Sequence, residues 1–98
     1  MNTTETYLNL LREFKQRYAA EYGITRIGIF GSVARGEQKK GSDVDVCVEM
    51  KEPDLFLLIG LKDDLQSTLG CDVDVVRLRK NMNPFLLSRI EKESLYVW

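Results

Sequence analysis

The spacing of apolar residues changes several times along these 98 residues, and this constrains the fold more than any other feature of the sequence. Steps of three and four residues, which are typical of helices, alternate with steps of two and unbroken apolar runs, which are typical of strands. Strands interleaved with helices favour an α/β (α+β) domain, in which helices cover a small mixed sheet of three to four strands. Because so short a chain has room for one hydrophobic core, we predict a single domain over residues 1–98.

The predicted elements follow one another with short connections. Helices are expected at residues 5–22, 53–69 and 83–93. Strands are expected at residues 25–30, 44–50 and 72–77, with a last short one at 95–98. Gly23 and Gly70 are well placed to end the first two helices, while Pro53 suits a first helical turn and Asn83 with Pro84 forms a capping pair.

The charge balance argues against some classes of partner and chemistry. The chain has 14 basic and 15 acidic residues, so it lacks the basic excess with which proteins neutralise a long nucleic-acid backbone. A short 3′ end stays open as a partner. The absence of histidine excludes a histidine general base and a histidine-ligated zinc site. Any catalysis must come from carboxylates, hydroxyls, cations and bound metal.

The cysteines and the apolar runs indicate a compartment. Cys47 and Cys71 lie far apart beside apolar segments and match no metal-ligand spacing, so we predict buried free thiols in a reducing environment. No apolar run is long enough to span a bilayer, and the first residues lack the basic start and apolar middle of a signal peptide. A cytoplasmic protein without a membrane partner is expected.

A glycine–serine pair follows the first predicted strand. Gly31 lets a ligand approach the backbone, and Val33 to Arg35 can form one helical turn. The free amides at the start of that turn, together with the Ser32 hydroxyl, would form a small anion site. A plain strand-to-helix turn with Ser32 as N-cap would contain the same residues, and for this pair alone it is the favoured interpretation.

Two aspartates open the second strand. Asp43 and Asp45 are two residues apart, so both carboxylates project from the same face, with Cys47 and Glu49 further along it. Like charges held this close repel unless a cation neutralises them, and Mg²⁺ suits oxygen ligands in a chain without histidine. Solvation of both carboxylates at a strand edge is the alternative, and it is favoured for this pair taken alone.

A third aspartate lies within the next strand. Asp74 is flanked by apolar residues, and a carboxylate buried there would need a partner. If this strand lies beside residues 44–50, Asp74 can join Asp43 and Asp45 around metal ions. Asp72 shares that face but lies nearer the strand's start, where water suffices, so we interpret it as structural.

Taken together, these residues form a family pattern. Gly31-Ser32-Val33-Ala34-Arg35-Gly36, then Ser42-Asp43-Val44-Asp45, then Asp74, resembles the signature of the DNA polymerase beta-like nucleotidyltransferase superfamily. The form of the pattern resembles its small single-domain branch, the minimal nucleotidyltransferases (MNT), over nearly the whole chain. Cys47 departs from the pattern, since such strands usually carry an aliphatic residue there, but it touches no catalytic position.

The resemblance implies roles for individual residues. Asp43 and Asp45 would hold the metals that carry the triphosphate, and Asp74 would ligate the second metal and help activate the acceptor hydroxyl. Gly31 and Ser32 would hold the β- and γ-phosphates of ATP. Arg35 would either add a cationic contact to the nucleotide or stay solvated. A pair of Mg²⁺ ions is therefore the implied cofactor.

The resemblance also implies partners. Such chains resemble the antitoxins of HEPN/MNT toxin–antitoxin pairs, in which the MNT protein transfers AMP from ATP to a tyrosine of a HEPN-domain toxin. A second subunit, as a homo-oligomer or a partner, would complete a site with so few walls. Two alternatives stay open: a binding module that neutralises its partner by contact alone, and nucleotidyl transfer to a small molecule such as an aminoglycoside. The sequence assigns no residue to recognition of the base.

Overall fold

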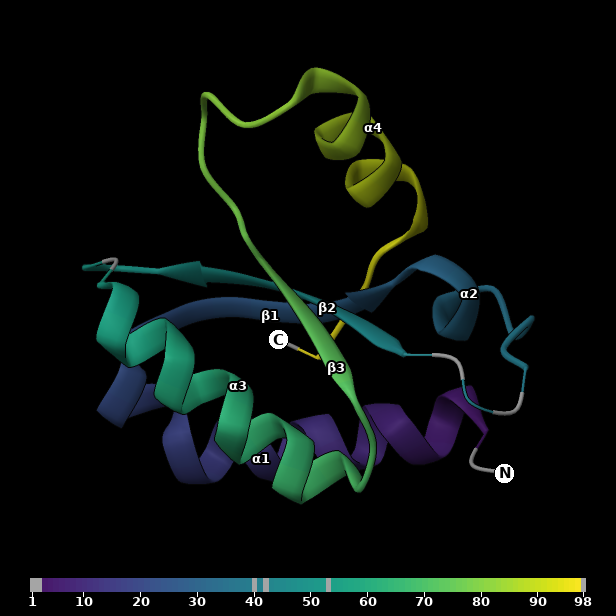
Figure 1. Ribbon diagram of the computed structural model, residues 1–98, viewed down its shortest axis with the longest axis horizontal. Helices are drawn as coiled ribbons and strands as arrows, with labels where there is room; N and C mark the ends of the chain where they lie inside the picture. Colours follow the sequence, from purple (N-terminus) through teal and green to yellow (C-terminus); the bar gives the residue numbers. More distant parts are fainter. Residues whose placement is uncertain (1–2, 40, 42, 53, 98) are drawn as a thin grey trace.

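The computed structural model describes residues 3–39, 41, 43–52 and 54–97. The features predicted at Lys40, Ser42, Pro53 and Trp98 lie outside these residues. Along the chain the elements are α1 (Thr4–Tyr22), β1 (Ile24–Phe30), α2 (Gly31–Ala34), β2 (Val44–Met50), α3 (Leu55–Leu69), β3 (Val73–Arg77), α4 (Pro84–Glu93) and β4 (Leu95–Tyr96). The predicted α/β architecture with a small mixed sheet is confirmed (Figure 1).

Helix boundaries follow local capping chemistry. The Asn83 side chain accepts hydrogen bonds from the backbone N–H groups of Phe85 and Leu86, at 2.9 and 3.2 Å, and Pro84 opens α4 as predicted. Helix α3 begins at Leu55, later than predicted, because the Asp54 carboxylate caps its first turn. Gly23 and Gly70 end α1 and α3 in the left-handed conformation, as the sequence predicts.

The sheet has the order β3-β2-β1-β4, with β2 antiparallel to β1 and parallel to β3. In this register Phe30, at the end of β1, lies opposite Asp45, which in turn lies opposite Asp74 of β3. The pairing continues beyond the strand ends, where the Val44 N–H donates to the Asp72 carbonyl at 3.1 Å. The end of β1, the start of β2 and the start of β3 therefore meet at one edge.

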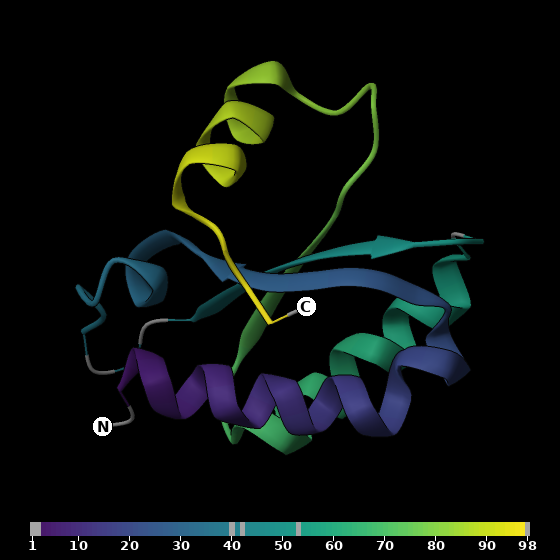
Figure 2. The same ribbon diagram turned by 180° about the vertical axis from the view of Figure 1, so that it is seen from behind.

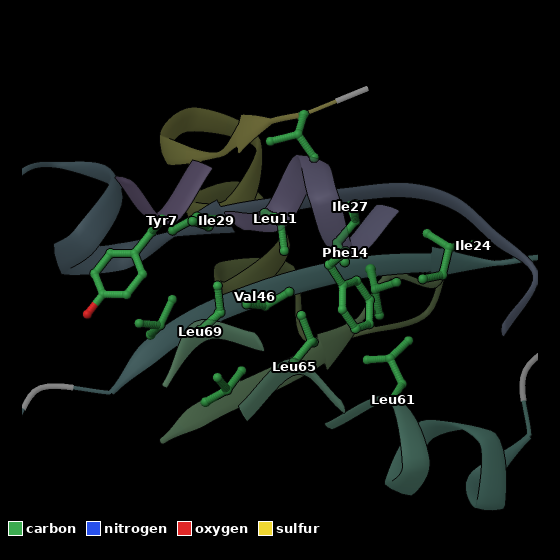
Figure 3. Packing of buried hydrophobic residues seen from close by; sticks show 14 of the residues in the cluster. Tyr7, Leu11, Phe14, Ile24, Ile27, Ile29, Val46, Leu61, Leu65 and Leu69 are labelled. Carbon is green, nitrogen blue, oxygen red and sulfur yellow. The ribbon is translucent and has the colours of Figure 1, made fainter. Parts of the chain in front are cut away.

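Helices cover both faces of the sheet. α1 and α3 lie together on one face and α4 lies on the other (Figures 1 and 2). The larger core lies under α1 and α3, where Leu11, Phe14 and Leu65 are fully buried against the inward side chains of β1 and β2 (Figure 3). Burying each such side chain contributes roughly 1.5–3 kcal/mol.

The second face carries a smaller core. Phe30, Cys47, Leu78, Met82 and Ile90 form an apolar cluster under α4. Cys47 is fully buried there as a free thiol, as predicted, whereas Cys71 is only half-buried. The face of β2 that carries Asp45, Cys47 and Glu49 is therefore unevenly buried. Helix α4 covers its middle at Cys47 and leaves its end at Asp45 less covered.

Strand β4 is the outer strand of the sheet next to β1, and it packs closely against Gly28 of β1. A side chain at Gly28 would place its Cβ 2.7 Å from the Leu95 carbonyl oxygen and 2.8 Å from the Tyr96 ring. This close approach lets β4 pair with β1, which ties the end of α4 to the sheet. Among the described residues no helix is both long and apolar enough to cross a membrane.

Tyr22 joins α1 to α3 and generates a prediction about alkaline stability. Its hydroxyl donates a hydrogen bond to Asp64, and burial followed by this bond raises the pKa of Tyr22 above its ordinary value. A phenol whose pKa is raised by folding stabilises the fold fully below its unfolded pKa of about 10, and loses that contribution as the pH rises through the folded value.

We therefore expect Tyr22→Phe to lower the free energy of unfolding by about 1 kcal/mol at neutral pH. The difference between wild type and Tyr22→Phe should shrink as the pH rises above about 10. Urea denaturation between neutral pH and pH 11 measures it. A difference that stays constant over this range would contradict the role of the Tyr22 hydroxyl.

Candidate active site

The glycine–serine turn follows β1 directly. The chain leaves the sheet at Phe30, which is the N-cap of α2 without any side-chain capping bond. Ser32 lies inside the helical turn, so the alternative interpretation of Ser32 as its N-cap is wrong. Helix α1 supports the turn, because the Thr4 hydroxyl donates to the Val33 carbonyl at 2.5 Å.

Gly31 fits its position for two reasons. Its φ is +74°, a left-handed conformation that costs other residues about 1–2 kcal/mol. A Cβ there would overlap Oδ2 of Asp45 and lie 3.2 Å from its Cγ. The absent side chain therefore makes room for the Asp45 carboxylate against the turn.

The three predicted aspartates come together at this edge of the sheet. Asp45 is half-buried in β2, while Asp43 is exposed just before the strand. Asp74 is also exposed, because β3 is an edge strand and the apolar packing under α4 reaches it only at Val76, so its carboxylate does not depend on a buried partner. Asp72 is exposed too, and its carbonyl helps to fix the register, in line with a structural role.

The electrostatics of the site centre on Asp45. Burial raises the pKa of Asp45, and the nearby carboxylates of Asp74 and Asp43 raise it further. The guanidinium groups of Arg89 and Arg35 act in the opposite direction. The ionised carboxylate is thus destabilised in the fold, and a bound cation would relieve the repulsion.

Arg35, the other predicted nucleotide-binding residue, is paired with carboxylates. Its guanidinium lies 3.1 Å from Glu37 and 2.9 Å from Glu93 of α4. Glu93 also lies 3.4 Å from Arg89, one helical turn earlier. Arg35 is therefore held at the rim of the site.

Sequence reasoning missed Arg89 and Glu93. Their i, i+4 spacing on an amphipathic helix is typical of a solvent-exposed ion pair. Nothing in the sequence indicates that α4 crosses the sheet with these residues above Gly31. Only the packing of α4 on the second face brings them to the aspartates.

The donor set suits a metal that brings other ligands with it. Within the described part of the chain, no group of three or more cysteine, aspartate or glutamate side chains is arranged to hold a metal ion by itself. Mg²⁺ in phosphoryl-transfer sites is usually held by one or two carboxylates, with water and substrate phosphates as further ligands. The arrangement of Asp43, Asp45 and Asp74 is compatible with that mode.

A pocket of about 510 Å³ lies elsewhere, between α4 and the other end of the sheet. Glu49, Leu87 and Tyr96 are among its lining residues, and none of the three aspartates lines it. The candidate site rests on the convergence of the aspartates and the glycine–serine turn, whose chemistry the pocket lacks.

A glycine–serine turn facing paired strand aspartates, on a small mixed sheet between helices, defines a nucleotidyltransferase domain. The family model for the nucleotidyltransferase domain matches residues 9–97, and the chain belongs to this family. The predicted resemblance to this superfamily is confirmed.

Similar proteins indicate which members of the nucleotidyltransferase family the chain resembles. A protein of Methanocaldococcus jannaschii assigned as a protein adenylyltransferase is 36% identical over 99% of this chain and 100% of its own length. The protein adenylyltransferase MntA of Thermococcus cleftensis is 35% identical over 99% of this chain and 98% of its own length. A solved structure assigned as a minimal nucleotidyltransferase is 36% identical, covers 96% of this chain and 95% of its own, and has a TM-score of 0.79.

Solved toxin–antitoxin complexes share the fold. One contains AMP-PNP; its matching chain is 26% identical, with 92% of this chain and 73% of that chain covered and a TM-score of 0.74. Another, from Shewanella oneidensis, holds a tri-AMPylated HEPN toxin with its MNT antitoxin. At 22% identity and a TM-score of 0.67, with 93% of this chain and 71% of that chain covered, the second likeness shows the fold alone.

Asp45→Asn should stabilise the protein at neutral pH. Because folding raises the pKa of Asp45, its ionised form destabilises the fold above the folded pKa, and this penalty disappears as the pH falls below the unfolded value of about 3.9. The stabilisation should therefore vanish in acid. Urea denaturation at pH 7 and below pH 4 measures it, and equal stabilisation at both would contradict the electrostatic origin.

Gly31→Ala and Gly36→Ala form a matched pair, since their φ angles are +74° and +71°. Both variants place alanine in a left-handed conformation, which destabilises the fold. A Cβ at Gly36, however, would meet nothing closer than Thr4 Oγ1 at 4.0 Å. Because a Cβ at Gly31 would displace Asp45 from the candidate site, we expect Gly31→Ala to lose roughly 100-fold more nucleotidyltransferase activity than Gly36→Ala. Equal losses would show that backbone strain, not the position of Asp45, matters.

Proposed function

We propose that the protein is a Mg²⁺-dependent protein adenylyltransferase, which moves AMP from ATP to a tyrosine hydroxyl of a HEPN-domain partner and so acts as an antitoxin. The observation that carries the proposal is the convergence of Asp43, Asp45 and Asp74 opposite the Gly31–Ser32 turn. The names of its relatives support AMP as the transferred group. The toxin–antitoxin complex with AMP-PNP, whose matching chain is 26% identical, supports a toxin as the partner, and the HEPN class of that toxin follows the family resemblance.

Asp43 and Asp45 would hold the metal ions that carry the triphosphate, and Asp74 would complete the second position. When bound, Mg²⁺ screens the negative charge that develops on the phosphates and aligns the reacting oxygens. The all-oxygen donor set fits this ion, and so does the electrostatic cost of leaving Asp45 ionised without a cation.

The protein's own groups would bind and orient the substrates. The backbone at Gly31 and the hydroxyl of Ser32 would hold the β- and γ-phosphates. The acceptor oxygen attacks the α-phosphorus, the bond from that phosphorus to the bridging oxygen of the β-phosphate breaks, and pyrophosphate leaves. The hydroxyl proton passes to the Asp74 carboxylate, which lies at the open edge strand where an acceptor approaches.

The exposure of the site favours a macromolecular acceptor. Asp43 and Asp74 are exposed, so these residues offer few walls to hold a small acceptor. A partner that brings its own surface would supply the missing contacts. Nucleotidyl transfer to a small molecule is accordingly disfavoured. The expected location of the protein is the cytoplasm.

A binding-only antitoxin is the second candidate, because the surface offers apolar side chains outside the site. Leu55, Phe56 and Ile59 on α3 and Phe85 on α4 are between 53% and 87% exposed. Such residues suit a protein interface. In that case the toxin would be neutralised by contact and the aspartates would be dispensable.

The test uses ATP labelled at the α-phosphate, Mg²⁺, and the purified chain with a HEPN-domain protein of the same source organism. We expect label on the partner with wild type, and a loss of about 100-fold or more with Asp43→Asn/Asp45→Asn, because metal-based charge stabilisation contributes several kcal/mol. Mass spectrometry of the partner should place the AMP on a tyrosine.

Asp72→Asn is the matched control, because it removes an exposed carboxylate from the same strand region without touching the proposed ligands. It should transfer AMP like wild type. If no variant labels the partner, yet Asp43→Asn/Asp45→Asn still suppresses the toxin, the adenylyltransferase proposal fails and the binding-only candidate replaces it.

A further inference from the structure

Arg89 lies over the glycine–serine turn although it belongs to none of the motifs. Its Nη2 is 3.5 Å from the position that a Cβ would take on Gly31, the same position that Oδ2 of Asp45 would overlap. The guanidinium, the turn and the carboxylate therefore share one small volume. A phosphate group held by Gly31 would lie within reach of this guanidinium.

Its surroundings orient the guanidinium and leave donors available. Nε of Arg89 donates to Glu93 at 3.4 Å, and its guanidinium carbon lies 5.9 Å from the centre of the Phe30 ring. The side chain is 49% exposed, so part of the guanidinium faces solvent. Because a guanidinium has five N–H donors in a fixed fork, a single bond to Glu93 leaves a pair free for an anion.

The charge balance at this edge calls for such a cation. Asp43, Asp45 and Asp74 gather negative charge where a triphosphate would add more. Arg35 and Arg89 are the cations that act on Asp45, and Arg35 is paired with two carboxylates, Glu37 and Glu93. Among the described residues Arg89 forms an ion pair with Glu93 alone, so it has the greater capacity for a phosphate.

We propose that Arg89 binds the β- and γ-phosphates of the nucleotide and thereby selects a triphosphate over a monophosphate, while Glu93 positions it. The inference rests on the proposed function, since it concerns the nucleotide of that site. It assigns to α4 a direct part in substrate selection. Helix α4, which covers the second face of the sheet, would thus close the phosphate site on the side that faces Asp45.

The test compares Arg89→Gln, Arg89→Lys and a control variant by calorimetric titration with Mg²⁺ and either α,β-methylene-ATP, which cannot release pyrophosphate, or AMP. We expect Arg89→Gln to weaken the affinity for the triphosphate analogue by about 10- to 100-fold, as for the loss of a charged hydrogen bond, and to leave the affinity for AMP unchanged. Arg89→Lys should recover only part of the loss, because an ammonium group lacks the bidentate fork.

Arg12→Gln is the matched control. Arg12 also pairs with a glutamate on a helix surface, at 3.5 Å from Glu5, but lies on α1 on the other face of the sheet. Its nucleotide affinities should equal those of wild type. The thermal unfolding midpoint of each variant shows whether the substitution has loosened α4. A loosened α4 would weaken the binding of AMP and of the analogue alike, whereas the loss of a phosphate contact would weaken the binding of the analogue alone.

An Arg89→Gln variant that binds the analogue like wild type, or that weakens AMP and the analogue equally, would overturn the inference. If the analogue affinity falls selectively while no AMP reaches a HEPN-domain partner, the inference stands and the proposed acceptor is wrong. Failure of wild type to bind either nucleotide would overturn both.

Discussion

The pairing of β2 is the constraint on which the rest of the structure depends. This strand is antiparallel to β1 and parallel to β3, so a strand end and two strand starts meet at one edge. A slip of one residue on either side would turn Asp45 or Asp74 to the opposite face, into the core under α1 and α3. The inward Val44, Val46 and Val48, all fully buried, prevent that slip because it would expose them to solvent or to polar neighbours.

The larger core and the candidate site lie on different faces of the sheet. The larger core under α1 and α3 contains most of the fully buried side chains and stabilises the fold. The other face tolerates an unfavourable arrangement, in which Asp45 is held near two further carboxylates against a backbone turn that only glycine fits. Destabilising charge at a site is typical of positions selected for chemistry rather than for folding.

Helix α4 links the smaller core to the candidate site. Its apolar side, through Ile90, completes the smaller core with Phe30 and Cys47, and β4 ties its end to β1 across Gly28. Its polar side carries Arg89 and Glu93 to the rim of the site, where Glu93 also holds Arg35. A change that loosened α4 would therefore affect both the packing under it and the cations around Asp45.

The sequence by itself determined the alternation of elements, the α4 cap at Asn83, the glycine–serine turn and the aspartates as site candidates, because periodicity, capping and motif spacing are local properties. It left the burial of Asp74 open, favoured an N-cap role for Ser32 taken alone that the structure gives to Phe30, and gave no sign of Arg89. Whether Asp74 is buried depends on β3 being an edge strand, and whether Ser32 is a cap depends on where the chain leaves β1. Arg89 reaches Gly31 only because α4 crosses the face opposite α1 and α3, and such a long-range contact follows from packing the whole chain, which no local pattern encodes.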